Sequence, residues 1–277
     1  MGYFDNVPTG TLIGSLVPAI NVTDSTISTS TPSRVISGPT VWPVIDWAFS
    51  PVYVTGTSGI YFYFDLGSVQ SFNSILITTV TNSTAFSFNF SSAANESYAA
   101  ASGSPQIIAG PSYPPFSQGP GALVYKYPSP ISARYVKISL SGSANIFVAE
   151  VAFSNLVELQ YNERQSTFTR TPGSINEQSL IMQNGRQIKI ITGKATDRIH
   201  CSYAWSDDGT LSKSIYNILN AVATTGAPLF WVPPIKERTN DEVNNRKAEF
   251  INLEAIPDII QSSATSWSME FSGRCQP

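Results

Sequence analysis

The stretch Ile60-Tyr-Phe-Tyr-Phe-Asp-Leu-Gly67 decides the fold of the first half of the chain. Its first five residues are β-branched or aromatic, which is the composition enriched in strands. Asp-Leu-Gly is typical of the turn that follows a strand. Phe86, Phe88 and Phe90 alternate with polar residues, and residues 135–140 alternate too. Alternation with a period of two predicts strands that bury one face.

Further strands are predicted at residues 74–78 and 147–153, with loops rich in glycine, proline and serine between them. Many short strands joined by such loops predict an antiparallel β-sandwich. The alternation places these side chains in the core of the sandwich: Phe62, Phe64, Ile75, Ile77, Val136, Ile138 and Val151.

The charge composition changes near residue 155, and this change predicts a domain boundary. Residues 1–158 hold four basic and seven acidic residues, and the rest of the chain holds 12 of each. We therefore expect a β-sandwich domain at residues 1–154 and a second domain at residues 155–277. The chain as a whole is predicted to be mainly β.

The second domain is predicted to be α+β, with a sheet and one amphipathic helix. Strands are expected at residues 186–192 and 265–271, because both segments alternate. Thr210 can cap the helix at its start and Gly226 can end it. The apolar residues that follow helical spacing are Leu211, Ile215, Ile218, Leu219 and Val222.

The composition excludes some classes of function. The net charge is −3, and no long run of lysine and arginine occurs, so nucleic-acid binding is not expected. No apolar stretch reaches the roughly 18–20 residues that cross a membrane. The amino-terminal segment has no basic start, and prolines and glycines interrupt its apolar residues. We therefore expect the chain to be made in, and not exported from, a cytoplasm.

The residue types of catalysis do not gather in the sequence. His200 is the only histidine, and its neighbour Cys201 should point to the opposite face of a strand. Asp207 and Asp208 precede a glycine between a strand and a helix, where turn chemistry is expected. Cys275 is the second cysteine, and we expect both thiols to be free. No catalytic residue, metal site or cofactor is predicted, and the chain is not expected to be an enzyme.

One loop carries a candidate ligand site. Trp42, Asp46, Trp47 and Tyr53 lie together in a segment interrupted by prolines. Aromatic rings can stack on a sugar, and a carboxylate can accept hydrogen bonds from its hydroxyls. The same residues would also suit a loop whose aromatic side chains hold it to the core.

Residues 60–67, 72–77 and 133–138 with 148–153 resemble the discoidin branch of the galactose-binding-like β-sandwiches. The resemblance covers roughly residues 15–154, and it implies a galactose-binding-like fold whose loops bind sugars, lipids or proteins. The cysteine pair that often ties the ends of this family together is missing here.

The second domain resembles domains of tailed-phage tail-tip and baseplate proteins. The resemblance lies in Tyr203-Ala-Trp205, the helix, Gly226-Ala-Pro-Leu-Phe-Trp231 and Ser266-Trp-Ser-Met-Glu-Phe271. It implies a structural component of a virion, made in the host cytoplasm, which assembles through its second domain. Its expected partners are other tail or baseplate proteins and further copies of itself.

Two alternative functions remain open from the sequence. The first is a carbohydrate-binding module or adhesin that recognises surface glycans. The second is an accessory domain of an enzyme, which would need a catalytic partner chain. A measurable affinity for glycans would favour the first alternative, and a large native assembly would favour the tail protein.

Overall fold

The computed structural model divides the chain into two compact units, residues 1–159 with 230–248, and residues 160–229 with 249–277. The predicted division at residues 154 and 155 stays a prediction. The structure describes residues 8, 10–17, 21–25, 52–54, 60–78, 81–92, 98–109, 122–148, 150–159, 167–172, 175–181, 187–194, 197–235 and 248–275.

The fold is mainly β, as the sequence predicts, and one helix is present among the described residues. The strands of the first unit are β1 (Leu12–Gly14), β2 (Leu16–Val17), β3 (Asn21–Ser25), β4 (Val52–Val54), β5 (Ile60–Thr78), β6 (Thr81–Ser91), β7 (Gln106–Ala109), β8 (Ala122–Val148), β9 (Glu150–Ser154), β10 (Val157–Glu158) and β15 (Leu229–Val232).

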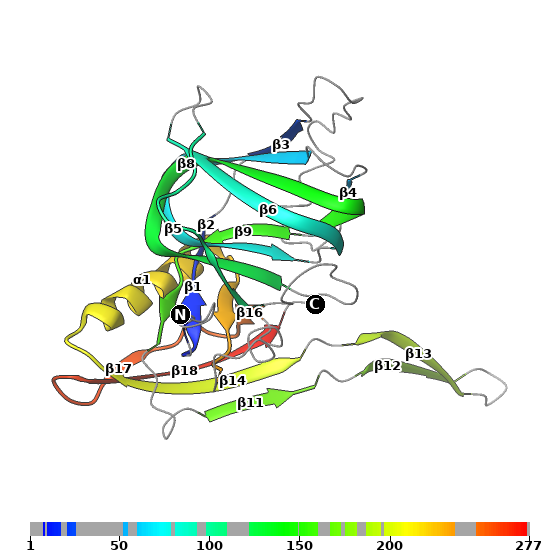
Figure 1. The fold of residues 1–277 in the computed structure, drawn as a ribbon. Helices are drawn as coiled ribbons and strands as arrows, with labels where there is room; N and C mark the ends of the chain where they lie inside the picture. The colour runs from blue at the N-terminus through cyan, green and yellow to red at the C-terminus, as the bar shows by residue number, and fades with distance from the viewer. Residues whose placement is uncertain are drawn as a thin grey trace. The chain divides into compact units, whose positions relative to one another are not determined.

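Two long strands, β5 and β8, build both layers of an antiparallel sandwich (Figure 1). The first half of β5 pairs with β3 and with residues 135–140 of β8. The second half of β5 pairs with β9 and with residues 122–126 of β8. β6 joins the first layer and β7 joins the second, each through β8. The sequence therefore forms the predicted sandwich, but with two strands that are longer than expected.

The bend in β5 lies where a turn was predicted after the first strand. That expectation is wrong, because the strand continues through Asp65 and Gly67 with a shift in register. Gly67 has a φ of 78°, a left-handed conformation that glycine adopts without a steric penalty. The Asp65 carboxylate accepts a hydrogen bond of 2.8 Å from the Gly67 amide. A local irregularity thus bends one strand into both layers.

The core of the sandwich lies between the two layers and is rich in aromatic rings. All seven side chains that alternation placed in the core are at most 2% exposed. Phe64 in the first layer lies 5.3 Å, between ring centroids, from Phe153 in the second. Phe88 and Tyr125 make a similar edge-to-face pair at 4.8 Å. These pairs join the layers, since edge-to-face rings gain stability beyond the area that they bury.

A smaller antiparallel arrangement completes the first unit, in the order β10, β1 and β15. β1 lies between the two others, and its residues Leu12 and Ile13 are fully buried. All four residues of β15 are buried too.

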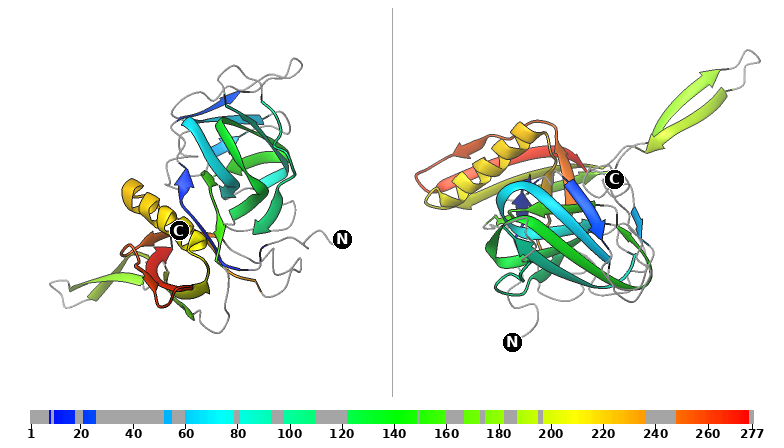
Figure 2. Two further views of the ribbon diagram at one scale, coloured as in Figure 1. Left: turned by 90° about the vertical axis from the view of Figure 1, so that its left-hand side faces the viewer. Right: turned by 90° about the horizontal axis from the view of Figure 1, so that it is seen from above.

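The second unit has an antiparallel sheet in the order β16, β18, β14 and β11, with β17 beside β18. A separate two-stranded sheet contains β12 and β13 (Figure 2). The bounds of these elements are β11 (Thr167–Thr171), β12 (Ile175–Ile181), β13 (Gln187–Lys194), β14 (Arg198–Ser206), α1 (Thr210–Thr225), β16 (Glu249–Leu253), β17 (Ile259–Gln261) and β18 (Ser266–Cys275).

The helix α1 packs on this sheet through its apolar stripe, as predicted. Ile215, Ile218, Leu219 and Val222 are buried, and Trp205 of β14 donates a hydrogen bond of 3.0 Å to the Ser212 hydroxyl. Gly226 ends the helix in a left-handed conformation, and its amide donates to the Val222 carbonyl, as the sequence indicated.

The start of α1 differs from the prediction that Thr210 caps it. Gly209 is the capping position, and it has no side chain to accept a hydrogen bond. The Asp207 carboxylate accepts instead from the Ser212 amide at 2.9 Å. No helix among the described residues is long and apolar enough to cross a membrane.

Candidate functional site

The structure describes only one of the four residues of the predicted ligand site. Trp42, Asp46 and Trp47 lie outside the described residues. Tyr53 lies on β4, where its backbone is opposite Phe147 of β8. The prediction of a ligand site at these four residues therefore stays a prediction.

His200 and Cys201 lie on opposite faces of β14, as expected for neighbours in a strand. The Cys201 side chain is fully buried, and burial raises the pKa of its thiol to about 12. Cys201 and Cys275 are both free, as predicted. A protonated thiol on the far face from the imidazole cannot serve as a nucleophile paired with it.

Asp207 and Asp208 form the turn between β14 and α1, as the sequence predicted. Asp207 accepts hydrogen bonds from the Gly209 amide and from the backbone and hydroxyl of Ser212. Hydrogen bonds from Thr210 lower the pKa of Asp208. Both carboxylates therefore satisfy backbone groups at the start of the helix, where negative charge is also favourable.

The structure brings two residues to His200 that the sequence did not single out. The Ser272 hydroxyl lies 2.9 Å from His200 Nδ1, and a Glu270 carboxylate oxygen lies 3.4 Å from Nε2. A serine, a histidine and a carboxylate can support acyl transfer, but that chemistry also needs donors for an oxyanion. Strands flank β18 on both sides over most of its length, so most of its backbone amides are paired within the sheet. The arrangement is suited to hydrogen bonding with a ligand.

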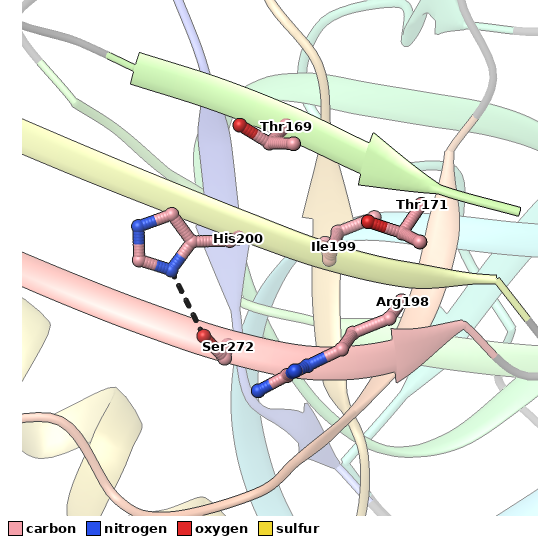
Figure 3. Close-up of a pocket in the computed structure, with 6 residues that line it drawn as sticks. All are labelled: Thr169, Thr171, Arg198, Ile199, His200 and Ser272. Atoms are coloured by element: carbon pink, nitrogen blue, oxygen red, sulfur yellow. Dashed lines mark hydrogen bonds between the residues drawn. The ribbon is translucent and has the colours of Figure 1, made fainter.

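A hollow of about 140 Å³ opens beside His200 on the outer face of this sheet (Figure 3). Its sides come from three strands, β11, β14 and β18, and its floor is the β14 backbone at Ile199. Periodicity could not find this hollow, because its residues come from segments that only the strand register brings together. The lining residues are Thr169, Thr171, Arg198, Ile199, His200 and Ser272.

A second surface lies in the first unit, on the outer face of β5 and β8. We name the residues Tyr61, Tyr63, Tyr98 and Lys137 the tyrosine surface. The Lys137 ammonium lies 4.3 Å from the ring centroid of Tyr61 and 5.7 Å from that of Tyr63. Tyr98 packs edge-on against Tyr63 at 5.7 Å. All four side chains are partly exposed, so rings and ammonium reach solvent together.

An ion pair flanks the tyrosine surface. Arg134 donates two hydrogen bonds to the Asp65 carboxylate, at 2.9 and 3.0 Å. These bonds are the main cause that lowers the pKa of Asp65, with a further contribution from the Gly67 amide. The Arg134 guanidinium also lies 4.9 Å from the ring centroid of Tyr135. Polar and aromatic groups thus continue along the same face.

The sequence contained the signal for this surface. In the segment 60–64, tyrosine and phenylalanine alternate, and the structure buries Phe62 and Phe64 while Tyr61 and Tyr63 face outward. The choice of tyrosine at the outward positions was visible as a pattern. The residue pattern by itself predicts only a strand in this segment.

No group of three or more histidine, cysteine, aspartate or glutamate side chains that could hold a metal ion occurs among the described residues.

Comparison with known proteins gives structural likenesses only. No family model matches the chain, and no curated protein matches it. A carbohydrate-binding module from AlyQ, solved with 4,5-unsaturated mannuronic acid, is 19% identical, with a TM-score of 0.34, over 50% of this chain and 96% of that one. Truncated AlyQ with its binding module and alginate lyase domains is 12% identical, with a TM-score of 0.36, over 95% and 100%.

A fucolectin from striped bass (Morone saxatilis) serum is also similar, with 12% identity and a TM-score of 0.34 over 92% of this chain and 88% of that one. None of these three names describes a phage tail or baseplate protein. The assignment of the β-sandwich rests on the strand register and the core described above, not on these likenesses.

Proposed function

We propose that the first unit is a glycan-binding module and that it binds sugar through the tyrosine surface. The observation that carries this proposal is the group of partly exposed tyrosine rings around one lysine on a single sheet face. The sequence offered glycan recognition as an alternative to a virion role. The geometry of the described residues favours that alternative.

The chemistry of the surface suits a sugar. A sugar ring has apolar C–H faces and a rim of hydroxyl groups, so it needs flat apolar area beside hydrogen-bonding groups. Tyrosine supplies both, since its ring is apolar and its hydroxyl can donate or accept. Lys137 adds donors, and Asn89, which is opposite Lys137 on β6, adds both donors and an acceptor.

Buried neighbours and strand pairing hold the backbone of the surface in place. Tyr61 and Tyr63 alternate along β5 with Phe62 and Phe64, which are each 1% exposed in the core. Lys137 lies directly opposite Tyr63 in the register of β5 and β8. Contact groups fixed in this way lose little conformational entropy on binding, so more of the contact energy appears as affinity.

The test is glycan-array binding of the full chain, followed by titration of any glycan that binds. We expect Tyr63→Ala to weaken the affinity about two- to tenfold, because an aromatic contact contributes about 0.5–1.5 kcal/mol beyond its buried area and 1.4 kcal/mol is tenfold. The matched control is Tyr216→Ala, which removes a tyrosine that is 62% exposed on α1. Equal affinities of the Tyr63 and Tyr216 variants would refute binding through the tyrosine surface.

A second candidate function is the assembly role that the sequence suggested, as a tail or baseplate component in a virion. The observation that favours a partner is the β12–β13 sheet, whose strands pair with each other and with no other strand in the described part of the chain. A two-stranded hairpin alone is marginally stable in water. A neighbouring subunit, either another copy or a different tail protein, would supply the missing support.

Light scattering on the purified chain tests this second candidate. If the hairpin mediates self-association, removal of residues 175–194 should convert an oligomer into a monomer while the circular dichroism of the remainder is kept. If the wild-type chain is monomeric at high concentration, self-association through the hairpin is excluded. Binding to other tail proteins would then need those proteins in the assay.

A further inference from the structure

We propose that the hollow on the outer face of β11, β14 and β18 binds a small oxyanion group, a carboxylate or a phosphate, and binds it more tightly when His200 is protonated. This site lies in the second unit and is separate from the glycan surface proposed above. The proposal rests on the strand register, on the arginines beside the hollow and on the hydrogen bonds of His200.

The register of three strands places polar side chains in two adjacent rows. Ile199 lies between the rows with its side chain fully buried in the other face, so the backbone there forms an open floor (Figure 3). The first row is Thr169, His200 and Ser272, and the second is Thr171, Arg198 and Arg274.

Arg198 is the main cation at the hollow, and its capacity is only partly used. Its Nη2 donates to the Glu254 carboxylate at 2.6 Å, which engages one of the five N–H donors of a guanidinium. Arg170 in the same unit shows that one guanidinium can serve two carboxylates, since it donates to Asp197 and Glu249, at 2.8 Å each. Arg198 can therefore hold Glu254 and an oxyanion at once.

A second arginine adds to the positive charge. Arg274 lies directly opposite Arg198 in the β14–β18 register, and like charges at such positions repel. Within the described residues, no ion pair is formed by Arg274. An anion beside Arg198 would relieve this repulsion. The opposing acids are Glu254 and Glu270, and the Glu270 side chain is 67% exposed, so water screens much of its charge.

The hydroxyl groups complete the donor set. Thr169 and Thr171 are exposed on β11, on the side of the hollow away from Ser272 (Figure 3). Each threonine hydroxyl can donate one hydrogen bond to an oxygen. Two hydroxyls and a guanidinium around one small volume match the several acceptor oxygens of a carboxylate or a phosphate.

His200 makes the binding depend on pH. The charged groups on the same face are Glu270 and Arg274 of β18 and Arg198 of its own strand, and its other neighbours are the neutral Ser272 and Thr169. Protonation gives the imidazole a positive charge and a donor on both nitrogens. A bound anion favours this charged form. By linkage, the anion binds more tightly to the chain with a charged imidazole than to the chain with a neutral one.

The single histidine of the chain makes the test direct. Phosphate or chloride is added to the full chain at equal ionic strength, at about pH 5 and at about pH 8, and the dissociation constant is obtained from the NMR signals of the His200 imidazole. A parallel pair compares glucuronate with glucose, which lacks the carboxylate. We expect phosphate, glucuronate or both to bind, with a dissociation constant about tenfold lower at the lower pH. A response to phosphate alone assigns the hollow to phosphate groups, and a response to glucuronate assigns it to acidic sugars.

Variants separate this site from general effects of salt. Arg198→Gln should abolish this binding, and Lys213→Gln should keep it, because Lys213 is an exposed cation on α1 that does not line the hollow. If Arg198→Gln does not fold, as judged by circular dichroism, the double variant Thr169→Val and Thr171→Val takes its place and should weaken the binding. Spectra that phosphate and glucuronate leave unchanged, or equal dissociation constants at the two pH values, overturn the proposal. So does binding that the variants at the hollow leave unchanged.

Discussion

Replacement of Phe153 by alanine should destabilise the first unit more than any surface change. Phe153 lies on β9 in the second layer of the sandwich and is fully buried. Its ring centroid is 5.3 Å from that of Phe64 in the first layer and 5.3 Å from that of Phe72. The variant would remove a ring that touches both layers and would leave a cavity between them.

The magnitude follows from these contacts. Replacement of a buried phenylalanine by alanine typically costs about 3–5 kcal/mol of stability. This cost is the sum of the lost transfer free energy of the ring and the cost of the cavity that it leaves. With two ring pairs lost, we expect Phe153→Ala to cost at least the middle of that range, about 4 kcal/mol. With a urea m-value of about 2 kcal/mol per molar, the unfolding midpoint should fall by about 2 M.

The assay is urea unfolding followed by circular dichroism on the full chain, with Val69→Ala as the control. Val69 lies on β5 and is 54% exposed, so its truncation should change stability by less than about 0.5 kcal/mol. A Phe153→Ala midpoint within the error of the Val69→Ala midpoint would refute a core that joins two layers at this ring.

Three further outcomes follow from local geometry. Asp65→Asn should lower the free energy of unfolding by about 0.5–1 kcal/mol at pH 7. The pKa of Asp65 is lowered in the folded chain, so its carboxylate contributes stability at any pH above the ordinary pKa of a carboxyl group. Urea unfolding at several pH values should show that the difference between the variant and the wild type disappears as the pH falls through the folded pKa. Cys201 and Cys275 should not react with a thiol reagent at pH 8 until the chain unfolds, because burial raises both pKa values to about 12. Gly226→Ala should lower stability by about 1 kcal/mol, as measured by thermal unfolding. The cause is backbone strain alone, since the added methyl group meets nothing within 4 Å.

The alternation of apolar residues predicted the core of the sandwich well. It identified seven side chains that the structure buries, including Phe62 and Ile138. It did not predict that the segments 60–64 and 74–78 form one strand. Alternation reports which face a residue occupies, and it is silent on curvature. The bend depends on the left-handed conformation of Gly67, which a sequence cannot distinguish from a turn that ends the strand.

The two candidate surfaces differ in how far the sequence could reveal them. The tyrosine surface is largely local, because Tyr61 and Tyr63 belong to one strand and their outward direction follows from the burial of Phe62 and Phe64. The hollow at His200 is different, since β11, β14 and β18 meet there only through long-range pairing. Such pairing depends on register, and a shift of one residue would turn every side chain to the opposite face.

Long-range pairing also bears on how the two domains should be tested as fragments. In the first unit, β1 pairs with β15, and Leu12 is opposite Val232, although more than two hundred residues separate them. A fragment of residues 1–154 would lack β15 and expose the fully buried Leu12 and Ile13 at an open strand edge. Failure of that fragment to bind glycan or to assemble would therefore reflect a lost strand as much as a lost function. A fair fragment of the first unit must keep residues 230–248 joined to it.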